Sequence, residues 1–249
     1  MRLFRNEIQR IFCDRLVSDE DLAIVEGKVA ELIGENFPDC KDEAMADPLI
    51  FGDYRHAVRR LTEDAEDARL YCDMGSLDTT RKIFDAVMEN YNMDNSPMTL
   101  VLFEQALLHL TRVHRIIRLP RGNALLVGVG GSGKQSLTRL ASYCAGYDIF
   151  NISLVRNYGE EEFREDLKKL YFTTGCDGTP LVFLFADTQI VIEAFVEDIN
   201  NILNSGEVPN LFANDEWEKI ISACRKPCEE AGITPTKDNI KATLLNIEP

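Results

Sequence analysis

Gly128-Val-Gly-Gly-Ser-Gly-Lys-Gln-Ser136 is the stretch that decides the fold, because it has the spacing G-x-x-x-x-G-K of a loop that wraps phosphate groups. The apolar run 123–128 predicts a buried strand leading into the loop, and the pattern over 134–144 predicts a helix after it. Glycines let backbone N–H groups turn toward phosphate, and the helix start and Lys134 add positive charge. The loop therefore predicts a nucleotide site, the alternative being a glycine-rich turn that binds nothing. The residues expected to contact nucleotide are Gly128, Val129, Gly130, Gly131, Ser132, Gly133, Lys134, Gln135 and Ser136.

A second apolar run, Leu181–Ala186, predicts a strand that ends at Asp187. Ligands of open α/β sheets bind beyond the C-terminal ends of the strands. We therefore expect Asp187 to hold the Mg²⁺ that accompanies the nucleotide. The alternative role for Asp187 is to cap a helix that starts at Thr188.

Two positions argue against rapid hydrolysis. Gln135 follows the lysine, where a Ser or Thr normally gives its hydroxyl to Mg²⁺, and only Ser136 is near enough to substitute in part. Thr188 follows Asp187, where a hydrolytic site would place a Glu to orient water. Such general-base help is worth about 100- to 10,000-fold. We expect a site that binds nucleotide better than it cleaves it, and we assign no catalytic residue.

The rest of the chain predicts helices around a parallel sheet. Helices are expected over 1–36 as a hairpin with Ser18 capping its second helix, then over 55–72, 77–91, 97–117, 160–170, 189–204 and 213–231. Strands are expected over 149–154 and 181–186, and a short extended piece over 49–51 within the loop 37–54. Strands that alternate with helices predict an α/β fold with a doubly wound parallel sheet and an N-terminal helical segment.

Composition narrows the classes of partner. With 27 basic and 42 acidic residues the net charge is −15 and the pI about 4.7, so the long-range field repels nucleic acid. No run of about 18 apolar residues and no signal peptide is evident, so we expect an intracellular, soluble protein and no membrane partner. Cys224 and Cys228 are four residues apart, but none of the three histidines has zinc spacing with them, so we expect no zinc site.

Several segments together are specific for a family. GVGGSGKQSLTRLA (128–141), preceded by LPRGNALLV (119–127) and followed by VFLFADTQI (182–190) and FVEDINNILNSGEVPNLF (195–212), resembles the fourth AAA+ module of axonemal dynein heavy chains. DPLIFGDY (47–54) and 98–123 look like the entry to that module, and 10–22 looks like the closing helices of the third module's lid. The resemblance covers nearly the whole chain.

The resemblance implies a P-loop AAA+ sheet flanked by helices, with 1–46 as the end of the preceding lid and 47–249 as a partial nucleotide-binding module. It implies a minus-end-directed microtubule motor of the ciliary or flagellar axoneme, whose first module does most of the hydrolysis while the fourth binds ATP or ADP, with Mg²⁺, and regulates. Implied partners are neighbouring AAA+ modules and, through the full motor only, microtubules and dynein intermediate and light chains. Gln135 and Thr188 agree with the family's pattern for this module.

The chain departs from a complete module at its C-terminal end. We expect no sensor strand, lid or stalk before Pro249, and hence a truncated segment that does not move on microtubules alone. Two alternatives to a weakly hydrolysing regulatory segment stay open. One is an active ATPase that uses Ser136. The other is a structural module of the dynein ring whose loop is vestigial.

Overall fold

The computed structural model describes residues 1–59, 69–230, 232, 234 and 236. They form two compact units, each built from two segments that are separated in the sequence. Unit 1 comprises Met1–Ile116 and Leu126–Gly146, and unit 2 comprises Ile117–Leu125 and the chain from Tyr147 onward. The phosphate loop and the helix after it therefore belong to unit 1, and Asp187 belongs to unit 2.

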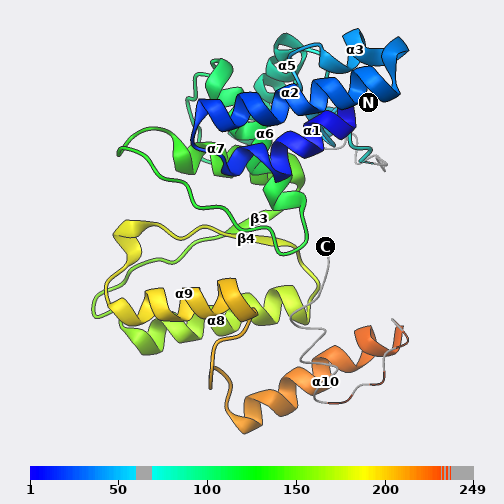
Figure 1. Ribbon diagram of the computed structural model, residues 1–249. Helices are drawn as coiled ribbons and strands as arrows, with labels where there is room; N and C mark the ends of the chain where they lie inside the picture. Colours follow the sequence, from blue (N-terminus) through cyan, green and yellow to red (C-terminus); the bar gives the residue numbers. More distant parts are fainter. Residues whose placement is uncertain (60–68, 231, 233, 235, 237–249) are drawn as a thin grey trace. The chain divides into compact units, whose positions relative to one another are not determined.

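Unit 1 begins with the predicted helical hairpin, α1 (Arg2–Ile11) and α2 (Asp19–Asn36) (Figure 1). Ser18 caps α2 as expected, because its Oγ accepts a hydrogen bond from the N–H of Glu20 at 3.2 Å. Short helical turns precede and follow α2: η1 (Cys13–Arg15), η2 (Pro38–Cys40) and α3 (Lys41–Met45).

The short extended piece expected over 49–51 becomes β1 (Phe51–Gly52), which pairs antiparallel with β2 (Cys72–Asp73). The helix predicted over 55–72 is therefore wrong at its C-terminal end, since Cys72 takes part in this pairing. Residues 60–68 of that prediction lie outside the described residues.

Three longer helices complete unit 1: α5 (Leu77–Asp94), α6 (Glu104–Arg118) and α7 (Lys134–Ala145). The last two residues of α6 lie beyond the boundary of unit 1. The buried side chains of α5, α6 and α7 form most of the core of unit 1. The fully buried apolar members are Phe84, Val87, Leu107, Leu110, Leu140, Ala141, Cys144 and Ala145.

The helix predicted from residue 97 begins only at Glu104. Side chains hold the preceding backbone in another conformation. The side chain of Asn92 donates to the carbonyl of Met98 at 3.1 Å and accepts from its N–H at 2.8 Å, and Arg81 Nε donates to the carbonyl of Leu102 at 3.1 Å. These bonds compete with helical hydrogen bonding over this stretch.

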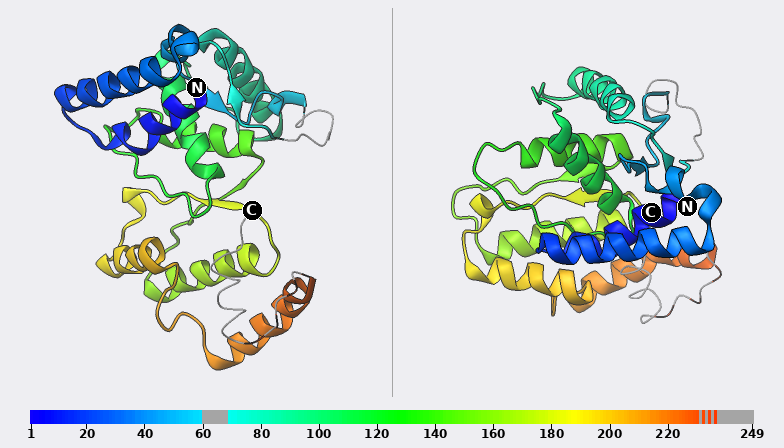
Figure 2. Two further views of the ribbon diagram at one scale, coloured as in Figure 1. Left: turned by 45° about the vertical axis from the view of Figure 1, so that its right-hand side comes forward. Right: turned by 45° about the horizontal axis from the view of Figure 1, so that its top comes forward.

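Unit 2 contains a parallel pair of strands, β3 (Asp148–Phe150) and β4 (Leu181–Phe183), in register with Ile149 opposite Val182. The strands coincide with the start of the predicted runs 149–154 and 181–186. Helix α8 (Glu160–Gly175) connects them, and α9 (Glu193–Ser205) follows β4. Figures 1 and 2 both show α8 and α9 side by side on one side of this sheet. The last helix is α10 (Asn214–Glu230).

The core of unit 2 lies between its helices and the sheet. Its buried members are Ile152, Tyr158, Phe163, Leu167, Phe195, Val208 and Leu211, with Phe183 and Phe185 packed against them. Phe163 of α8 stacks on Phe195 of α9 with ring centroids 4.2 Å apart. Asp198 of α9 is 4% exposed and accepts hydrogen bonds from Arg164 of α8 at 3.1 and 3.3 Å.

The strand predicted over 123–128 is wrong in this structure. Its residues have no strand conformation, and Leu125 and Val127 are 89% and 85% exposed. The segment crosses from unit 2 to unit 1 between Leu125 and Leu126, and no strand among the described residues pairs with it. An apolar run becomes a strand only where a neighbouring strand accepts its hydrogen bonds.

Candidate functional site

The phosphate loop of unit 1 depends on glycine at two positions. Gly131 has φ +76° and Gly133 has φ +79°, in the left-handed region that other residues rarely adopt. A Cβ on Gly133 would lie 3.2 Å from Cδ1 of Leu100, whereas around Gly130 and Gly131 no atom lies within 4 Å of that position. The loop is therefore closely packed at Gly133 and open to solvent at Gly130 and Gly131.

The side chain of Lys134 folds back onto this loop. Its Nζ donates hydrogen bonds to the carbonyls of Gly128 at 2.6 Å and Val129 at 2.8 Å, and to Oγ of Ser132 at 3.2 Å. All three acceptors are uncharged, so only the lysine contributes a charge to these bonds, whereas a phosphate oxygen would add the attraction between opposite charges. A phosphate group entering the loop therefore competes well for the lysine.

The N-terminus of α7 completes the anion-binding geometry. Gly133 is the N-cap, and the N–H of Leu137 bonds to its carbonyl at 2.8 Å. The N–H groups of Lys134, Gln135 and Ser136 precede this bond and have no acceptor within the helix. Together with the helix dipole they suit an anion. The residues present thus fit the phosphates of a nucleotide.

Packing in unit 1 fixes the position of α7. Thr138 is buried, and its Oγ1 donates to the carbonyl of Lys134 at 3.0 Å. Tyr143 meets Tyr91 of α5 edge to face, with ring centroids 5.3 Å apart, and its hydroxyl donates to Asp94. Burial and the Asp94 carboxylate raise the pKa of Tyr143 to about 12. The loop therefore starts a helix that is anchored at its far end.

The strand predicted to end at Asp187 ends earlier, because β4 stops at Phe183, and Asp187 is the first residue of the turn η3 (Asp187–Gln189). It is exposed, and its Oδ1 accepts a hydrogen bond from the N–H of Thr188 at 2.9 Å. A carboxylate has about four lone-pair positions, so this bond leaves oxygen lone pairs that could coordinate a metal ion. Lys134 belongs to unit 1 and Asp187 to unit 2.

Gln189 is a site residue that sequence reasoning missed. It is 8% exposed, and its Oε1 accepts from the N–H of Ala186 at 2.7 Å. Its Nε2 donates to Oδ1 of Asn151 at 2.6 Å and to the carbonyl of Ile152 at 2.7 Å. The side chain thereby joins the segments that follow β4 and β3, and it holds the turn that carries Asp187. A polar residue two positions after Asp187, the acid that follows the predicted strand, was the available signal.

Three of the basic residues that precede the loop in the sequence have partners of their own. Arg115 pairs with Glu7 of α1 at 2.5 Å, and Arg112 lies 3.6 Å from Asp14. In unit 2, the Arg118 guanidinium lies 5.5 Å from the ring centre of Tyr147. Arg112 and Arg115 therefore help to hold the N-terminal hairpin to α6.

The described part of the chain contains no group of three or more His, Cys, Asp or Glu side chains that could hold a metal ion. Mg²⁺ bound with nucleotide needs no such group, because one or two carboxylates, the phosphates and water supply its ligands. Within the same residues, no helix has both the length and the apolar character that crossing a membrane requires.

Comparison with known proteins places this geometry in a family. The model for "P-loop containing dynein motor region D4" matches residues 98–246. The chain is 44% identical over 246 residues to human "Dynein axonemal heavy chain 10" (99% of this chain, 5% of that protein). It is 44% identical over 241 residues to "Dynein-1-alpha heavy chain, flagellar inner arm I1 complex" of Chlamydomonas reinhardtii (96% and 5%), and 46% identical over 236 residues to human "Dynein axonemal heavy chain 6" (94% and 6%).

The chain thus spans about a twentieth of the length of these relatives. The match confirms the predicted α/β fold of the P-loop AAA+ type, a class whose members in general bind nucleotide. The chain belongs to the dynein motor region D4 family, the fourth AAA+ module of axonemal and flagellar dynein heavy chains.

Proposed function

We propose that residues 128–136 bind the phosphates of ATP or ADP and that Asp187 supports the accompanying Mg²⁺. The observation that carries the proposal is the placement of Lys134, whose Nζ lies on the loop carbonyls at the N-terminus of α7. On binding, the ammonium exchanges these neutral acceptors for phosphate oxygens, while the N–H groups of the first helical turn face the same anion. When bound, Mg²⁺ would neutralise phosphate charge.

The nucleotide site is proposed to regulate and to hydrolyse weakly or not at all by itself. Gln135 is exposed in the first turn of α7, where an amide is a poor ligand for small, octahedral Mg²⁺. Thr188 supplies a hydroxyl and no carboxylate to polarise a water molecule. In this proposal residues 1–46 end the lid of the preceding module, and 47–249 form part of the fourth.

The cellular setting proposed for the chain follows from its family. It is a segment of a microtubule motor in the axoneme of a cilium or flagellum, and its direct partners are the neighbouring AAA+ modules of the ring. Microtubules and intermediate and light chains are contacted by the whole motor only. Neither nucleic acid nor membrane is a partner, since the net charge of −15 disfavours phosphate polymers and anionic lipids.

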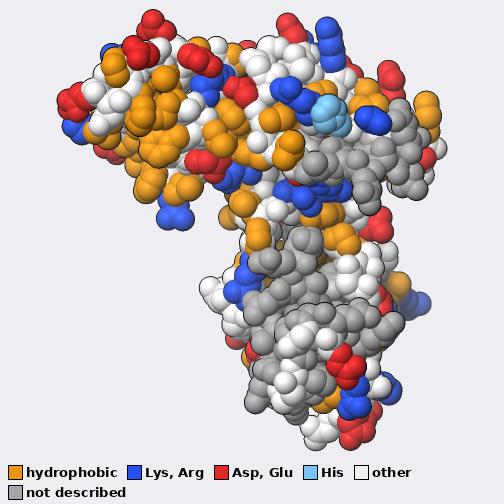
Figure 3. Space-filling view, turned by 90° about the vertical axis from the view of Figure 1, so that its right-hand side faces the viewer, with side chains coloured by type: hydrophobic (Ala, Val, Ile, Leu, Met, Phe, Trp, Pro, Cys, Tyr) orange, Lys and Arg blue, Asp and Glu red, His pale blue; other side chains and the backbone are white. Residues whose placement is uncertain are grey.

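A second role as an interaction module is supported by exposed apolar side chains on the N-terminal hairpin. Phe4, Ile11 and Phe12 are 57%, 53% and 60% exposed, and Ile24 of α2 is 69% exposed. Figure 3 shows apolar side chains gathered on unit 1. Contiguous apolar surface of this kind marks protein interfaces. Docking of this hairpin against another part of the ring is compatible with nucleotide binding by the loop.

The test of nucleotide binding is calorimetric titration of the folded chain with ATP and with ADP in the presence of Mg²⁺. We expect a dissociation constant below millimolar and at least a tenfold weakening by Lys134→Ala, equivalent to about 1.4 kcal/mol. Lys82→Ala is the matched control, because Lys82 is an exposed lysine of α5 in the same unit. Equal effects of the two substitutions would show that the loop is not the site.

Two further measurements separate the candidate roles. Steady phosphate release that Asp187→Ala abolishes would contradict weak hydrolysis and favour an active ATPase. A melting temperature unchanged by excess Mg-ATP would favour a purely structural module, because a ligand at 100 times its dissociation constant adds about 2.7 kcal/mol of stability.

A further inference from the structure

Two cysteine side chains of unit 2 face each other at the junction of α8 and α10. Cys176 is the C-cap of α8, and Cys224 lies within α10, 48 positions later in the chain. Their Sγ atoms are 3.0 Å apart and are not joined by a disulfide. A disulfide bond is about 2.0 Å long, so a relative movement of about 1 Å would allow the bond to form.

The two thiols differ in access to solvent. Cys224 is 0% exposed, and its Sγ also lies 3.7 Å from the carbonyl of Gly175. Cys176 is half-buried and so remains open to a small reagent. Both belong to a small apolar cluster, separate from the main core of the unit, that includes Ile220 and Trp217. One thiol is thus positioned to react first, and the other already lies beside it.

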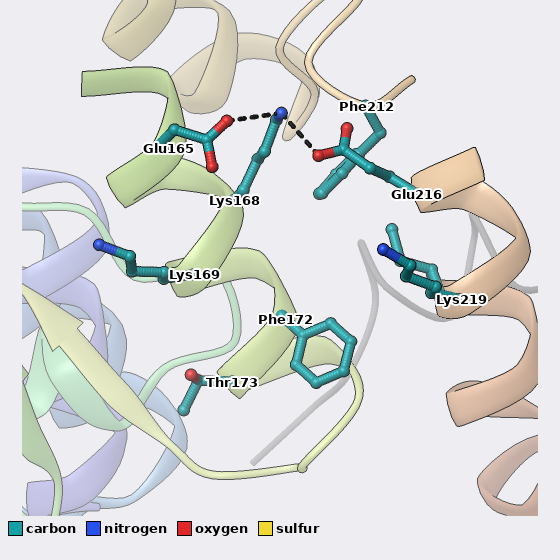
Figure 4. Close-up of a pocket in the computed structure, with 9 residues that line it drawn as sticks. Glu165, Lys168, Lys169, Phe172, Thr173, Phe212, Glu216 and Lys219 are labelled. Carbon is teal, nitrogen blue, oxygen red and sulfur yellow. Dashed lines mark hydrogen bonds and ion pairs between the residues drawn. The ribbon is translucent and has the colours of Figure 1, made fainter. Parts of the chain in front are cut away.

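The junction between α8 and α10 is otherwise sparsely packed. Lys168 of α8 bridges Glu165 and Glu216, each at 2.8 Å, and beside this bridge is a cavity of about 330 Å³ (Figure 4). Phe172 and Ile220 line the cavity, one helical turn before Cys176 and Cys224 respectively. The cavity therefore gives a small molecule space near the sulfur atoms, and a covalent bond there would reinforce a weak contact.

We propose that Cys176 and Cys224 form a reversible disulfide when the protein meets a low-molecular-weight disulfide such as glutathione disulfide. The thiolate of Cys176 attacks one sulfur of the reagent, breaks its S–S bond and releases one glutathione thiolate. The thiolate of Cys224 then attacks Sγ of Cys176 and releases the second glutathione. Two protein thiols are oxidised, one reagent disulfide is reduced to two glutathione thiols, and the two protons lost by the protein thiols end, by way of solvent, on the two glutathione sulfurs.

The surroundings of Cys176 determine how fast this exchange runs. Burial raises the pKa of its thiol, and the adjacent Cys224 and the nearby Asp177 raise the pKa further. Little thiolate is present at neutral pH, so the reaction is slow there and accelerates as the pH rises. The pair acts as a slow structural crosslink, unlike an activated catalytic cysteine.

The crosslink would close a loop that contains β4, the turn with Asp187 and α9. Closing a loop of this length restricts the unfolded chain and so raises the stability of unit 2. It would also tether α10 to the end of α8 in a way that the ion pair of Lys168 does not.

The test uses the full chain incubated with glutathione disulfide at a pH of about 8.5, which equals the pKa of an ordinary cysteine thiol. The expected product is lighter by two hydrogen atoms and gives a proteolytic peptide that links Cys176 to Cys224. The unfolding midpoint, followed by the fluorescence of Trp217, rises by several degrees and returns after reduction. Cys224→Ser should instead retain one glutathione on Cys176, with no crosslink.

Three further variants make the outcome decisive. Cys176→Ser, at the half-buried position, should abolish the crosslink without creating a fully buried hydroxyl. Cys40→Ser in unit 1 and Cys228→Ser in α10 should leave it intact. A crosslink through Cys228, a mixed disulfide that persists in the unmodified sequence, or two thiols that remain reduced would each overturn the proposal.

Discussion

Replacing Gln189 with alanine tests the hydrogen-bonded connection between the ends of β3 and β4. The substitution removes three hydrogen bonds, to the N–H of Ala186, Oδ1 of Asn151 and the carbonyl of Ile152. A hydrogen bond contributes about 0.5–1.5 kcal/mol net, and a group left buried without a partner costs more. Since Gln189 is 8% exposed, we expect a loss of about 3 kcal/mol in the free energy of unfolding of unit 2.

Urea denaturation followed by fluorescence measures this loss, because Trp217 is the single tryptophan and lies in unit 2. With a urea dependence of about 2 kcal/mol per molar, the midpoint should fall by about 1.5 M. Gln135→Ala is the matched control, since Gln135 is an exposed glutamine, and its effect should stay within about 0.5 kcal/mol. An equally small effect for Gln189→Ala would refute the argument.

The isosteric Gln189→Glu substitution tests the same hydrogen bonds independently, through the direction in which stability changes with pH. A carboxylate keeps the acceptor for the N–H of Ala186 but loses the two amide hydrogens that reach Asn151 and Ile152. Burial beside two acceptors raises the pKa of this carboxyl above its unfolded value. The variant therefore gains stability relative to the unmodified protein as the pH falls, because protonation restores a donor. Stability that is independent of pH in this comparison would show that the contacts do not form in solution.

Three further predictions concern packing, backbone and charge. Gly133→Ala should destabilise unit 1 by about 1–2 kcal/mol, because φ at this position is +79°. Gly27→Ala should stabilise the unit by about 0.5–1 kcal/mol, because Gly27 lies within α2 and no atom crowds its Cβ position. Urea titration followed by circular dichroism compares the two variants. Phe163→Ala should cost about 3–5 kcal/mol, because the ring is 0% exposed and stacked, and tryptophan fluorescence should report the loss. Lys168 lowers the pKa of Glu216 below 4.5, so the stabilising contribution of this carboxylate is present above that pH and is lost as the pH falls through the lowered pKa. As the pH is lowered from 7, the unfolding midpoint should therefore fall less steeply in Glu216→Gln than in the unmodified protein. Equal slopes of midpoint against pH in the two proteins would contradict this ion pair.

Features encoded by neighbouring residues could be read from the sequence. The spacing of the glycines and Lys134 predicted the loop and the start of α7, and Ser18 before three acidic residues predicted the start of α2. In each case the residues that form the feature are within one or two helical turns of each other. Local propensity and capping were therefore enough to predict it.

Features that depend on distant partners could not be read in the same way. The run 123–128 has the composition of a strand, but strand formation requires a neighbour that composition does not specify. Gln189 bonds to residues 37 and 38 positions earlier, and no periodicity marks such a contact. The late start of α6 depends in part on Arg81, whose Nε donates to the carbonyl of Leu102, 21 positions later in the chain. All three are set by tertiary contacts, which override local preference.

Each unit is built from segments that are not continuous in the sequence, and this limits how the chain can be cut into separate units. The chain passes from one unit to the other after Ile116, after Leu125 and after Gly146. No single proteolytic cut therefore yields two fragments that each hold one whole unit and nothing else. The crossing after Ile116 lies within α6, and the other two bound the segment with the phosphate loop and α7. Any hinge rotation between the units would therefore be taken up at all three places, two of which directly adjoin that segment.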